Sequence, residues 1–211
     1  MSLNKNILLI SIKLKYLKAD HIMLNNKIRL NLYNQSWYSR GKKGWIVIMW
    51  WLIQSSIFRF SFHNMYGWRN FLLRLFGAKI GQGVKVRSNA KFTYPWKVSI
   101  GDYSWIGDNV QFYSLDTICV GSNCVVSQES YLCTGSHNIK DPHFGLIVKP
   151  IIIKDGAWVA SDVFVYPGVT INEMAVVAAR STVIKDIPAN EVHAGSPAKY
   201  VKKRFEEDEL L

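Results

Sequence analysis

Between Ile80 and Val183 an apolar residue recurs in steps of six, with glycine and polar residues interspersed. A second residue, mostly small or β-branched, follows four positions later, as Val84 follows Ile80 and Ser104 follows Ile100. This period matches neither the alternation of a sheet strand nor the 3.6-residue repeat of a helix. It predicts a parallel β-helix, in which each hexad supplies one short strand and one corner. The fifteen apolar hexad positions are Ile80, Val86, Phe92, Ile100, Ile106, Phe112, Val120, Val126, Leu132, Ile153, Val159, Val165, Ile171, Val177 and Val183.

One interruption of the repeat predicts an inserted loop. Three hexads, or 18 residues, make one triangular coil, but the step from Leu132 to Ile153 is 21 residues, so a coil there carries inserted chain. We therefore expect an outward loop at about 138–150, within a β-helix of about five coils that spans residues 80–190. Solenoids gather such insertions on one face, which is often the binding face.

Residues 36–79 form a Trp-rich apolar segment followed by a predicted helix. The run WIVIMWWLI (Trp45–Ile53) is preceded by Lys42 and Lys43 and followed by Arg59, and it is shorter than the about 20 residues that cross a bilayer. Clustered Trp with flanking cations is typical of the lipid interface. Two alternatives remain open: a monotopic segment at 45–60 that contacts the membrane, or a helix packed on the β-helix.

Apolar residues at helical spacing predict a capping helix directly before the first hexad. Met65, Trp68, Leu72, Leu75 and Phe76 form its apolar positions. Two arginines at 69 and 74 fall among its polar positions, and the glycine at 77 is a stop signal. An open solenoid end exposes apolar rungs, so we expect this helix to pack on the core rather than to act in catalysis.

The two ends of the chain are less informative. Residues 1–35 are a basic extension, for which we consider an amphipathic membrane-surface helix, a disordered tail, or a start codon assigned upstream of a true start at Met23. Residues 191–211 contain a basic segment and an acidic tail.

The charge distribution and the cysteine content indicate the kind of partner surface and the cellular compartment. The net charge is +11, and residues 1–79 contain 13 of the 26 Lys and Arg but only one acid, Asp20. This asymmetry indicates an anionic partner surface. The neighbouring aromatic residues favour membrane, and no motif supports nucleic acid. Three cysteines, an odd number, and no cleavable signal predict a cytoplasmic protein. The alternative in which 45–60 contacts the membrane would make it peripheral at the inner face of the membrane. No CxxC motif indicates a zinc site.

His137 is the candidate catalytic residue, because it lies at the mouth of the predicted loop. A neutral imidazole can accept the proton of a substrate hydroxyl, although a solvated loop histidine is the commoner explanation. A β-helix hydratase would need three histidine ligands for zinc, and the coils before His137 contain none. Acyl-cysteine chemistry at Cys133 would need a base and an orienting acid, and we give it little weight.

Five stretches resemble the left-handed β-helix (hexapeptide-repeat) acyltransferases. They are FLLRLFGAKIG (71–81), FTYPWKVSIGDYSWIGDNV (92–110), SQESYLCTGSHNI (127–139), WVASDVFVYPGVTI (158–171) and VVAARSTVIKDIPA (176–189). TYPWK and LCTGSH narrow the resemblance to colanic acid and exopolysaccharide biosynthesis O-acetyltransferases, over about residues 36–204. The resemblance implies a left-handed coil, a homotrimer with active sites between neighbouring subunits, acetyl-CoA as co-substrate, no metal, and a saccharide acceptor.

The resemblance also implies roles for individual residues. His137 matches the general base, and the backbone N–H of Ser161, next to Ala160, matches the group that holds the thioester carbonyl. Asn138 stands where relatives commonly carry an Asp, so Asp116 or Asp141 could supply the charge beside the imidazole. The remaining cofactor-binding candidates are Ala178, Ala179 and Lys185 in the pantetheine groove, and Lys199, Lys202 and Arg204 at the phosphates of CoA.

We therefore expect acetyl transfer from acetyl-CoA to a hydroxyl of an exopolysaccharide or cell-surface polysaccharide repeat unit, or of its lipid-linked precursor. Two alternatives belong to other classes. One is a catalytically silent trimeric β-helix scaffold, and the other is an acyltransferase of the same fold with another acyl donor or an amine acceptor.

Overall fold

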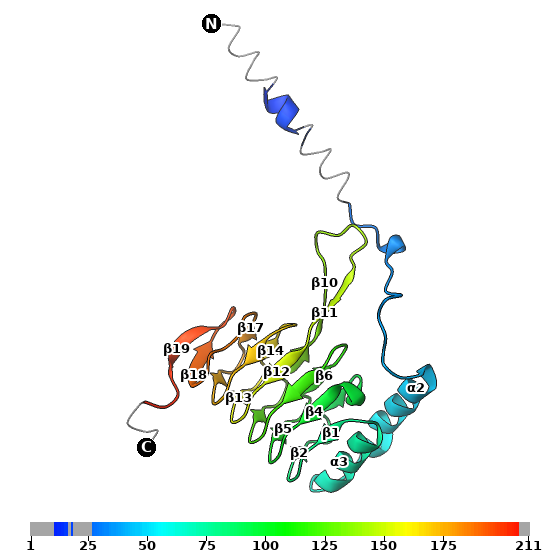
Figure 1. Cartoon of the computed structure of the whole chain (residues 1–211), viewed down its shortest axis with the longest axis vertical. Helices are drawn as coiled ribbons and strands as arrows, with labels where there is room; N and C mark the ends of the chain where they lie inside the picture. Colours follow the sequence, from blue (N-terminus) through cyan, green and yellow to red (C-terminus); the bar gives the residue numbers. More distant parts are fainter. Residues whose placement is uncertain (1–10, 17, 19–26, 207–211) are drawn as a thin grey trace, which may run out of the picture. The chain divides into compact units, whose positions relative to one another are not determined.

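In a computed structural model of the chain, which describes residues 11–16, 18 and 27–206, the hexads form a stack of coils (Figure 1). The apolar hexad residues line its interior. All fifteen are buried, with at most 9 % of their surface exposed. Most of the predicted extension 1–35 and the end of the acidic tail lie outside the described residues; residues 11–16 and 18 are helical.

Three parallel sheets, here named A, B and C, form the sides of the stack. Sheet A contains β1 (Lys79–Ile80), β4 (Val98–Ile100), β7 (Ile118–Val120), β12 (Ile151–Ile153) and β15 (Thr170–Ile171). Sheet B contains β2 (Lys85–Val86), β5 (Trp105–Ile106), β8 (Val125–Val126), β13 (Trp158–Val159), β16 (Val176–Val177), β18 (Glu191–Ala194) and the antiparallel β19 (Lys199–Lys203). Sheet C contains β3 (Lys91–Phe92), β6 (Gln111–Tyr113), β9 (Tyr131–Cys133), β14 (Phe164–Val165) and β17 (Thr182–Val183).

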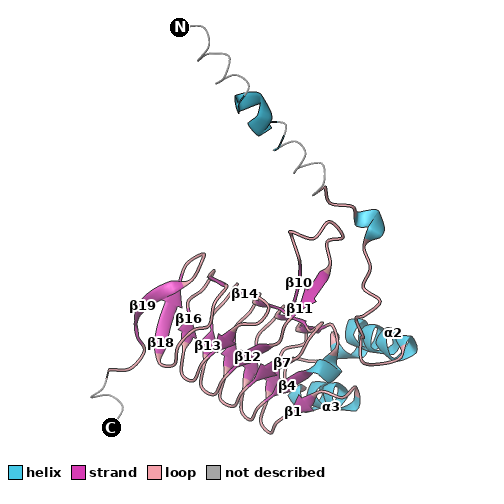
Figure 2. Ribbon diagram, turned by 45° about the horizontal axis from the view of Figure 1, so that its top comes forward, coloured by secondary structure: helices cyan, strands magenta, loops and turns pink. Residues whose placement is uncertain are grey.

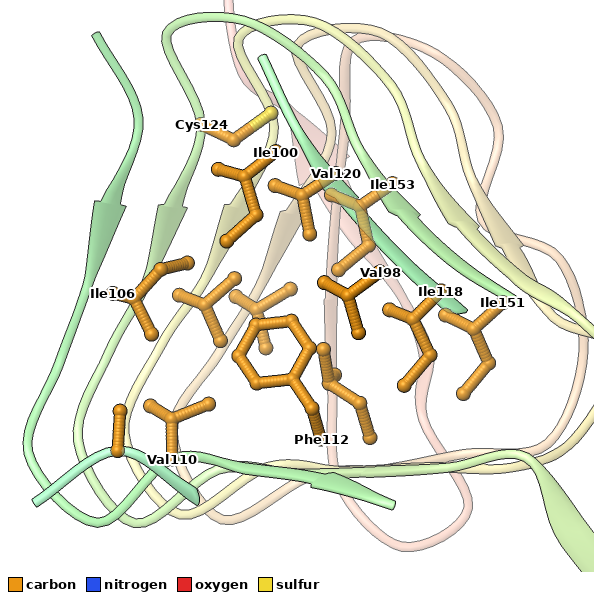
Figure 3. Packing of buried hydrophobic residues seen from close by; sticks show 14 of the residues in the cluster. Val98, Ile100, Ile106, Val110, Phe112, Ile118, Val120, Cys124, Ile151 and Ile153 are labelled. Atoms are coloured by element: carbon orange, nitrogen blue, oxygen red, sulfur yellow. The ribbon is translucent and has the colours of Figure 1, made fainter. Parts of the chain in front are cut away.

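The register of the sheets stacks equivalent hexad positions on one another. In sheet A, Ile100 pairs with Ile80 on one side and with Val120 on the other, and Val120 pairs with Ile153. Figure 3 shows Ile100, Val120 and Ile153 side by side in the interior. The predicted parallel β-helix is thus confirmed. The stack extends part of a coil beyond the last hexad, because Ile187 bridges to Ile171 and β18 continues sheet B.

Glycine at the corners has a steric cause. A Cβ atom added to Gly101 would lie 2.6 Å from the carbonyl carbon of Gly121, so the backbones of successive coils touch there. No larger residue fits at such a distance, which explains the glycine that often follows the first hexad position.

Helices cover the N-terminal end of the stack, beside β1 (Figure 2). They are α2 (Gly44–Ile53), the π-helical η2 (Gln54–Phe58) and α3 (Tyr66–Leu75). Trp50 and Phe58 are fully buried, and the Phe58 ring lies edge-on to Phe92 of the first coil, with ring centroids 6.3 Å apart. One side of α2 therefore packs on the β-helix, as one of the two alternatives for 45–60 proposed. Its other side is exposed, so membrane contact stays a prediction.

The same helices supply hydrogen-bond donors to the first coil. Along the strands of this stack, the N–H groups of one coil mostly donate to carbonyls of the next coil, as Gly81 N does to Ile100 O. The carbonyls of Ile80, Val86 and Phe92 in the first coil therefore have no preceding strand to donate to them. Side chains replace it on all three sheets. Arg74 donates to Ile80 O (Nε, 3.0 Å), Arg69 to Val86 O (Nε, 2.6 Å) and Trp50 to Phe92 O (Nε1, 2.7 Å). The bonds to Val86 O and Phe92 O are buried, and a buried carbonyl without a donor is costly, so these two contribute most to closing the open end.

Arg69 differs from the sequence-based expectation. The helical pattern assigns Arg69 to a polar position, but its side chain is fully buried. Desolvation by burial is the main cause that lowers its pKa from the ordinary value, and an arginine stays charged nonetheless.

The chain divides into two compact units. One contains residues 39–136 and 148–211, to which the coils and helices α2 to α3 belong together with the short η3 (Pro95–Lys97). The other combines residues 1–38, including η1 (Leu30–Leu32), with 137–147. The predicted loop is a hairpin of β10 (Gly135–His137) and β11 (Leu146–Val148), which form a two-stranded sheet. No helix among the described residues is both long enough and apolar enough to cross a membrane.

Candidate active site

His137, the last residue of β10, contacts Phe144 in two ways, through a hydrogen bond and through ring stacking. His137 Nδ1 lies 2.8 Å from the carbonyl oxygen of Phe144, and the two rings stack with centroids 4.3 Å apart and an interplanar angle of 10°. A carbonyl oxygen can only accept, so Nδ1 carries the proton. The neutral imidazole therefore keeps a lone pair on Nε2, which is the atom free to accept a proton.

The N-terminal segment contacts the same loop. The ring of Tyr33 lies 5.9 Å from that of His137, and the N–H of Arg29 donates to Pro142 O at 2.7 Å. Sequence reasoning missed Tyr33 and Arg29, because they lie far from the loop in the sequence. It also missed Phe144, which lies within the predicted loop, seven residues after His137.

The polar side chains of Asn138 and Asp141, near His137, accept hydrogen bonds from backbone N–H groups of the same loop. Asn138 Oδ1 accepts the N–H of Lys140 at 3.1 Å. Asp141 accepts the N–H groups of His143 (2.9 Å) and Gly145 (3.2 Å), and these bonds, that to His143 first, lower the pKa of its carboxyl group from the ordinary value. Both side chains thus hold the loop in shape, and the group that orients the imidazole is a backbone carbonyl.

Asp116 lies in the turn between β6 and β7 and is half-buried. Its carboxylate accepts the N–H of Thr117 at 2.7 Å, and its own N–H donates to Thr134 Oγ1 at 2.9 Å. These contacts make it part of a corner of the β-helix, in the unit that does not contain His137.

Four of the predicted cofactor-binding residues gather on one corner. This B–C corner is where the chain passes from a strand of sheet B to a strand of sheet C. Ala160 and Ser161 follow β13, and Ala178 and Ala179 follow β16 one coil further on. Ala160 is buried, Ser161 and Ala178 are half-buried, and Ala179 is exposed. Within the described chain the N–H groups of Ser161 and Ala179 donate to no acceptor, so both can bind a ligand oxygen.

The basic candidates are spread over three corners. Lys199 begins β19 and pairs with Ala194, at the B–C end of sheet B. Lys185 is exposed in the turn after β17, at the other end of sheet C. Arg204 donates through Nη1 to Gly156 O at 2.8 Å, in the turn before β13. Lys202 is exposed on β19. Of these, only Lys199 lies near Ala178 and Ala179 within one chain.

A hollow of about 500 Å³ lies over sheet B and was not foreseen. Trp105 borders it with a half-exposed ring, and Lys85 Nζ lies 4.4 Å from the ring centroid. Arg87 Nε donates to Asp108 Oδ2 at 2.7 Å on the same hollow. Lys85 and Trp105 each directly precede an apolar hexad residue, so both face outward from the coil. This outward position was the only signal in the sequence that could have predicted their place at the hollow.

Two of the three cysteines, Cys124 and Cys133, are poor candidates for a nucleophile. Burial raises the pKa of the Cys124 and Cys133 thiols from the ordinary value, so both stay protonated at neutral pH. In the part of the chain that the structure describes, no group of three or more His, Cys, Asp or Glu side chains could hold a metal ion.

No protein-family model matches the chain. It is 51% identical over 167 residues to the Escherichia coli (strain K12) protein named "Putative colanic acid biosynthesis acetyltransferase WcaF", which covers 79% of this chain and 92% of that protein. It is 28% identical over 143 residues to the galactoside O-acetyltransferase of Escherichia coli (strain K12), across 66% of this chain and 70% of that protein.

Solved structures agree with the fold. A maltose O-acetyltransferase from Clostridium difficile 630 superposes with a TM-score of 0.71 at 25% identity, over 78% of this chain and 90% of that chain. A galactoside acetyltransferase in complex with coenzyme A gives a TM-score of 0.71 at 25% identity, over 81% and 87%. The relative at 51% identity spans nearly its whole length, and the stacked hexads agree with it, so this chain belongs to the hexapeptide-repeat acetyltransferases, in the group of the colanic acid biosynthesis acetyltransferases.

Proposed function

We propose that this protein transfers the acetyl group of acetyl-CoA to a hydroxyl group of a saccharide, with His137 as the general base. The observation that carries the proposal is the bond between His137 Nδ1 and Phe144 O, which fixes the tautomer with a free lone pair on Nε2. Relatives support the substrate class, since their names include colanic acid biosynthesis, galactoside and maltose.

Acetyl-CoA supplies an activated acetyl thioester. His137 Nε2 takes the proton of the acceptor hydroxyl while the hydroxyl oxygen attacks the thioester carbonyl carbon. The N–H of Ser161 donates to the carbonyl oxygen as it becomes negative, which is commonly the largest catalytic contribution. His137 then returns the proton to the departing CoA sulfur as the carbon–sulfur bond breaks, so the imidazole ends neutral.

A homotrimer would bring His137 of one subunit to Ser161 of its neighbour. Ser161 precedes a strand of sheet C, whereas the segment that carries His137 follows another strand of that sheet. A neighbouring subunit that places its His137 beside the B–C corner would complete the site. Lys199 and Lys202 would then meet the CoA phosphates.

The hollow beside Trp105 is the candidate position for part of the acceptor. Sugar rings stack on exposed aromatic faces and hydrogen-bond to charged side chains, and Trp105, Lys85 and the Arg87–Asp108 pair provide both.

Calorimetry of the purified protein with acetyl-CoA, CoA and succinyl-CoA tests the donor. We expect micromolar binding of acetyl-CoA at one site per chain. Absence of binding by all three would remove the enzyme proposal and favour the silent scaffold, whereas a preference for succinyl-CoA would change the donor.

The base is tested by turnover with a saccharide acceptor. His137→Ala should lower kcat by about 10²–10⁴-fold, the usual contribution of a general acid–base group. His143→Ala is the matched control, since it removes an exposed histidine of the same loop, and we expect near-normal turnover from it. Near-normal turnover of His137→Ala would refute the assignment.

A further inference from the structure

The helices that close the β-helix carry a continuous apolar face toward solvent. Its members each expose more than a third of their surface, and Phe60 and Phe62 expose 80% and 78%. We call this set the exposed apolar face: Trp45, Ile48, Met49, Trp51, Leu52, Ile57, Phe60, Phe62, Trp68, Phe71 and Leu75. Single exposed apolar residues are ordinary, but eleven within one stretch of 31 residues mark an interaction surface.

This face is one surface and it is rigidly supported. Trp68 of α3 donates its indole N–H to Ile57 O at 3.3 Å, and its ring stacks on Phe71 at 5.8 Å. The exposed rows of α3 and η2 therefore meet. On the opposite side Val47 and Trp50 are buried against the β-helix, so α2 can offer only its outer side to a partner.

The charged residues within the segment that carries the face are all positive. Residues 39–79 contain no Asp or Glu. Lys42 and Lys43 are exposed directly before α2, and Arg59 is exposed directly after η2. Long basic side chains at the two ends of an apolar helix can reach lipid phosphates while their stems stay in the apolar layer.

We infer that the exposed apolar face docks onto the interfacial layer of an anionic phospholipid bilayer. Tryptophan and cations together are typical of that layer. A second copy of this chain fits less well, because a self-complementary contact would bring Lys42, Lys43 and Arg59 of both copies together without an acid to pair them. The surface is also wider than the predicted 45–60 segment, since Phe62 and α3 belong to it. This inference is independent of the proposed reaction.

Sedimentation of the full-length protein with phosphatidylcholine vesicles, with and without phosphatidylglycerol, tests it. We expect binding that increases with phosphatidylglycerol and falls with salt. Replacing Leu52, Phe60 and Phe62 by Ser should weaken binding to both vesicle types by about 10²-fold or more, because each removes a large apolar group from the lipid. The Lys42→Gln, Lys43→Gln, Arg59→Gln variant should lose about 10²-fold on anionic vesicles alone, near five-fold per cation.

The matched control is a triple variant at exposed apolar residues on the coils: Ile152→Ser, Met174→Ser and Val201→Ser. It should bind vesicles like the parent protein. Unchanged thermal unfolding of all variants shows that the fold is retained. Equal binding by the parent and the Leu52, Phe60, Phe62 variant would overturn the inference. So would an absence of vesicle binding by the parent, or a change of oligomeric state as the only effect of that variant, which would make the face a subunit contact.

Discussion

Replacing Arg69 by Met should destabilise the protein far more than the same change at Arg74. Both arginines come from α3 and donate to carbonyls of the first coil. Arg69 is fully buried and makes four hydrogen bonds, to Val86 O (2.6 Å), Ser61 Oγ (2.7 Å), Phe62 O (2.8 Å) and His63 O (2.7 Å). Arg74 is exposed, so water can replace it.

The magnitude depends on which acceptors water can reach. Met fills much of the volume of Arg69 but leaves Val86 O without a donor beneath α3, at a cost of about 1–3 kcal/mol for a buried unsatisfied group. The carbonyls of Phe62 and His63 lie in an exposed segment and regain water, so we assign about 1 kcal/mol to them together. The net loss is about 3 kcal/mol, which lowers the Tm of a domain of this size by about 6–12 °C. For Arg74→Met we expect about 0.5 kcal/mol or less.

Thermal unfolding followed by circular dichroism, at equal protein concentration for the parent and both variants, measures the difference. Equal concentration matters because subunit association would make Tm concentration-dependent. If Arg69→Met unfolds within 2–3 °C of Arg74→Met, about 1 kcal/mol, the polar closure of the solenoid end contributes little and apolar packing alone caps it.

Three further predictions concern the site and the thiols. Phe144→Ala keeps the carbonyl that orients the imidazole but removes the stacked ring, so kcat should fall by up to about tenfold, measured by acetylation of a saccharide acceptor. Ser161→Pro removes the free N–H and should lower kcat by about 10²–10³-fold, whereas Ser161→Ala, which keeps the N–H, should not; equal losses would contradict the oxyanion role. Iodoacetamide at neutral pH should label Cys119 before Cys124 and Cys133, because burial raises the pKa of the latter two thiols; mass spectrometry of the peptides gives the order.

The candidate site was only partly accessible to sequence reasoning. The interruption of the hexads located the loop, and the resemblance selected His137 within it. The orienting group could not be predicted, because it is the backbone carbonyl of Phe144. Every residue carries a backbone carbonyl, so residue identity does not show which one will bind the imidazole. The resemblance also grouped Ser161, Lys185 and Arg204 at one ligand, whereas within one chain they lie at different corners.

The sequence by itself determined the coil. Its period of six assigns one residue in each hexad to the interior, and burial of that row drives the folding of every rung, so the core follows from a local pattern. Only the tertiary structure decided how the open end is closed. Trp50 and Arg69 look like ordinary members of helices, yet each donates to a carbonyl of the first coil, 42 and 17 residues away in the chain. Such pairings arise because stacked strands leave one unpaired edge, which exists only once the coils have formed.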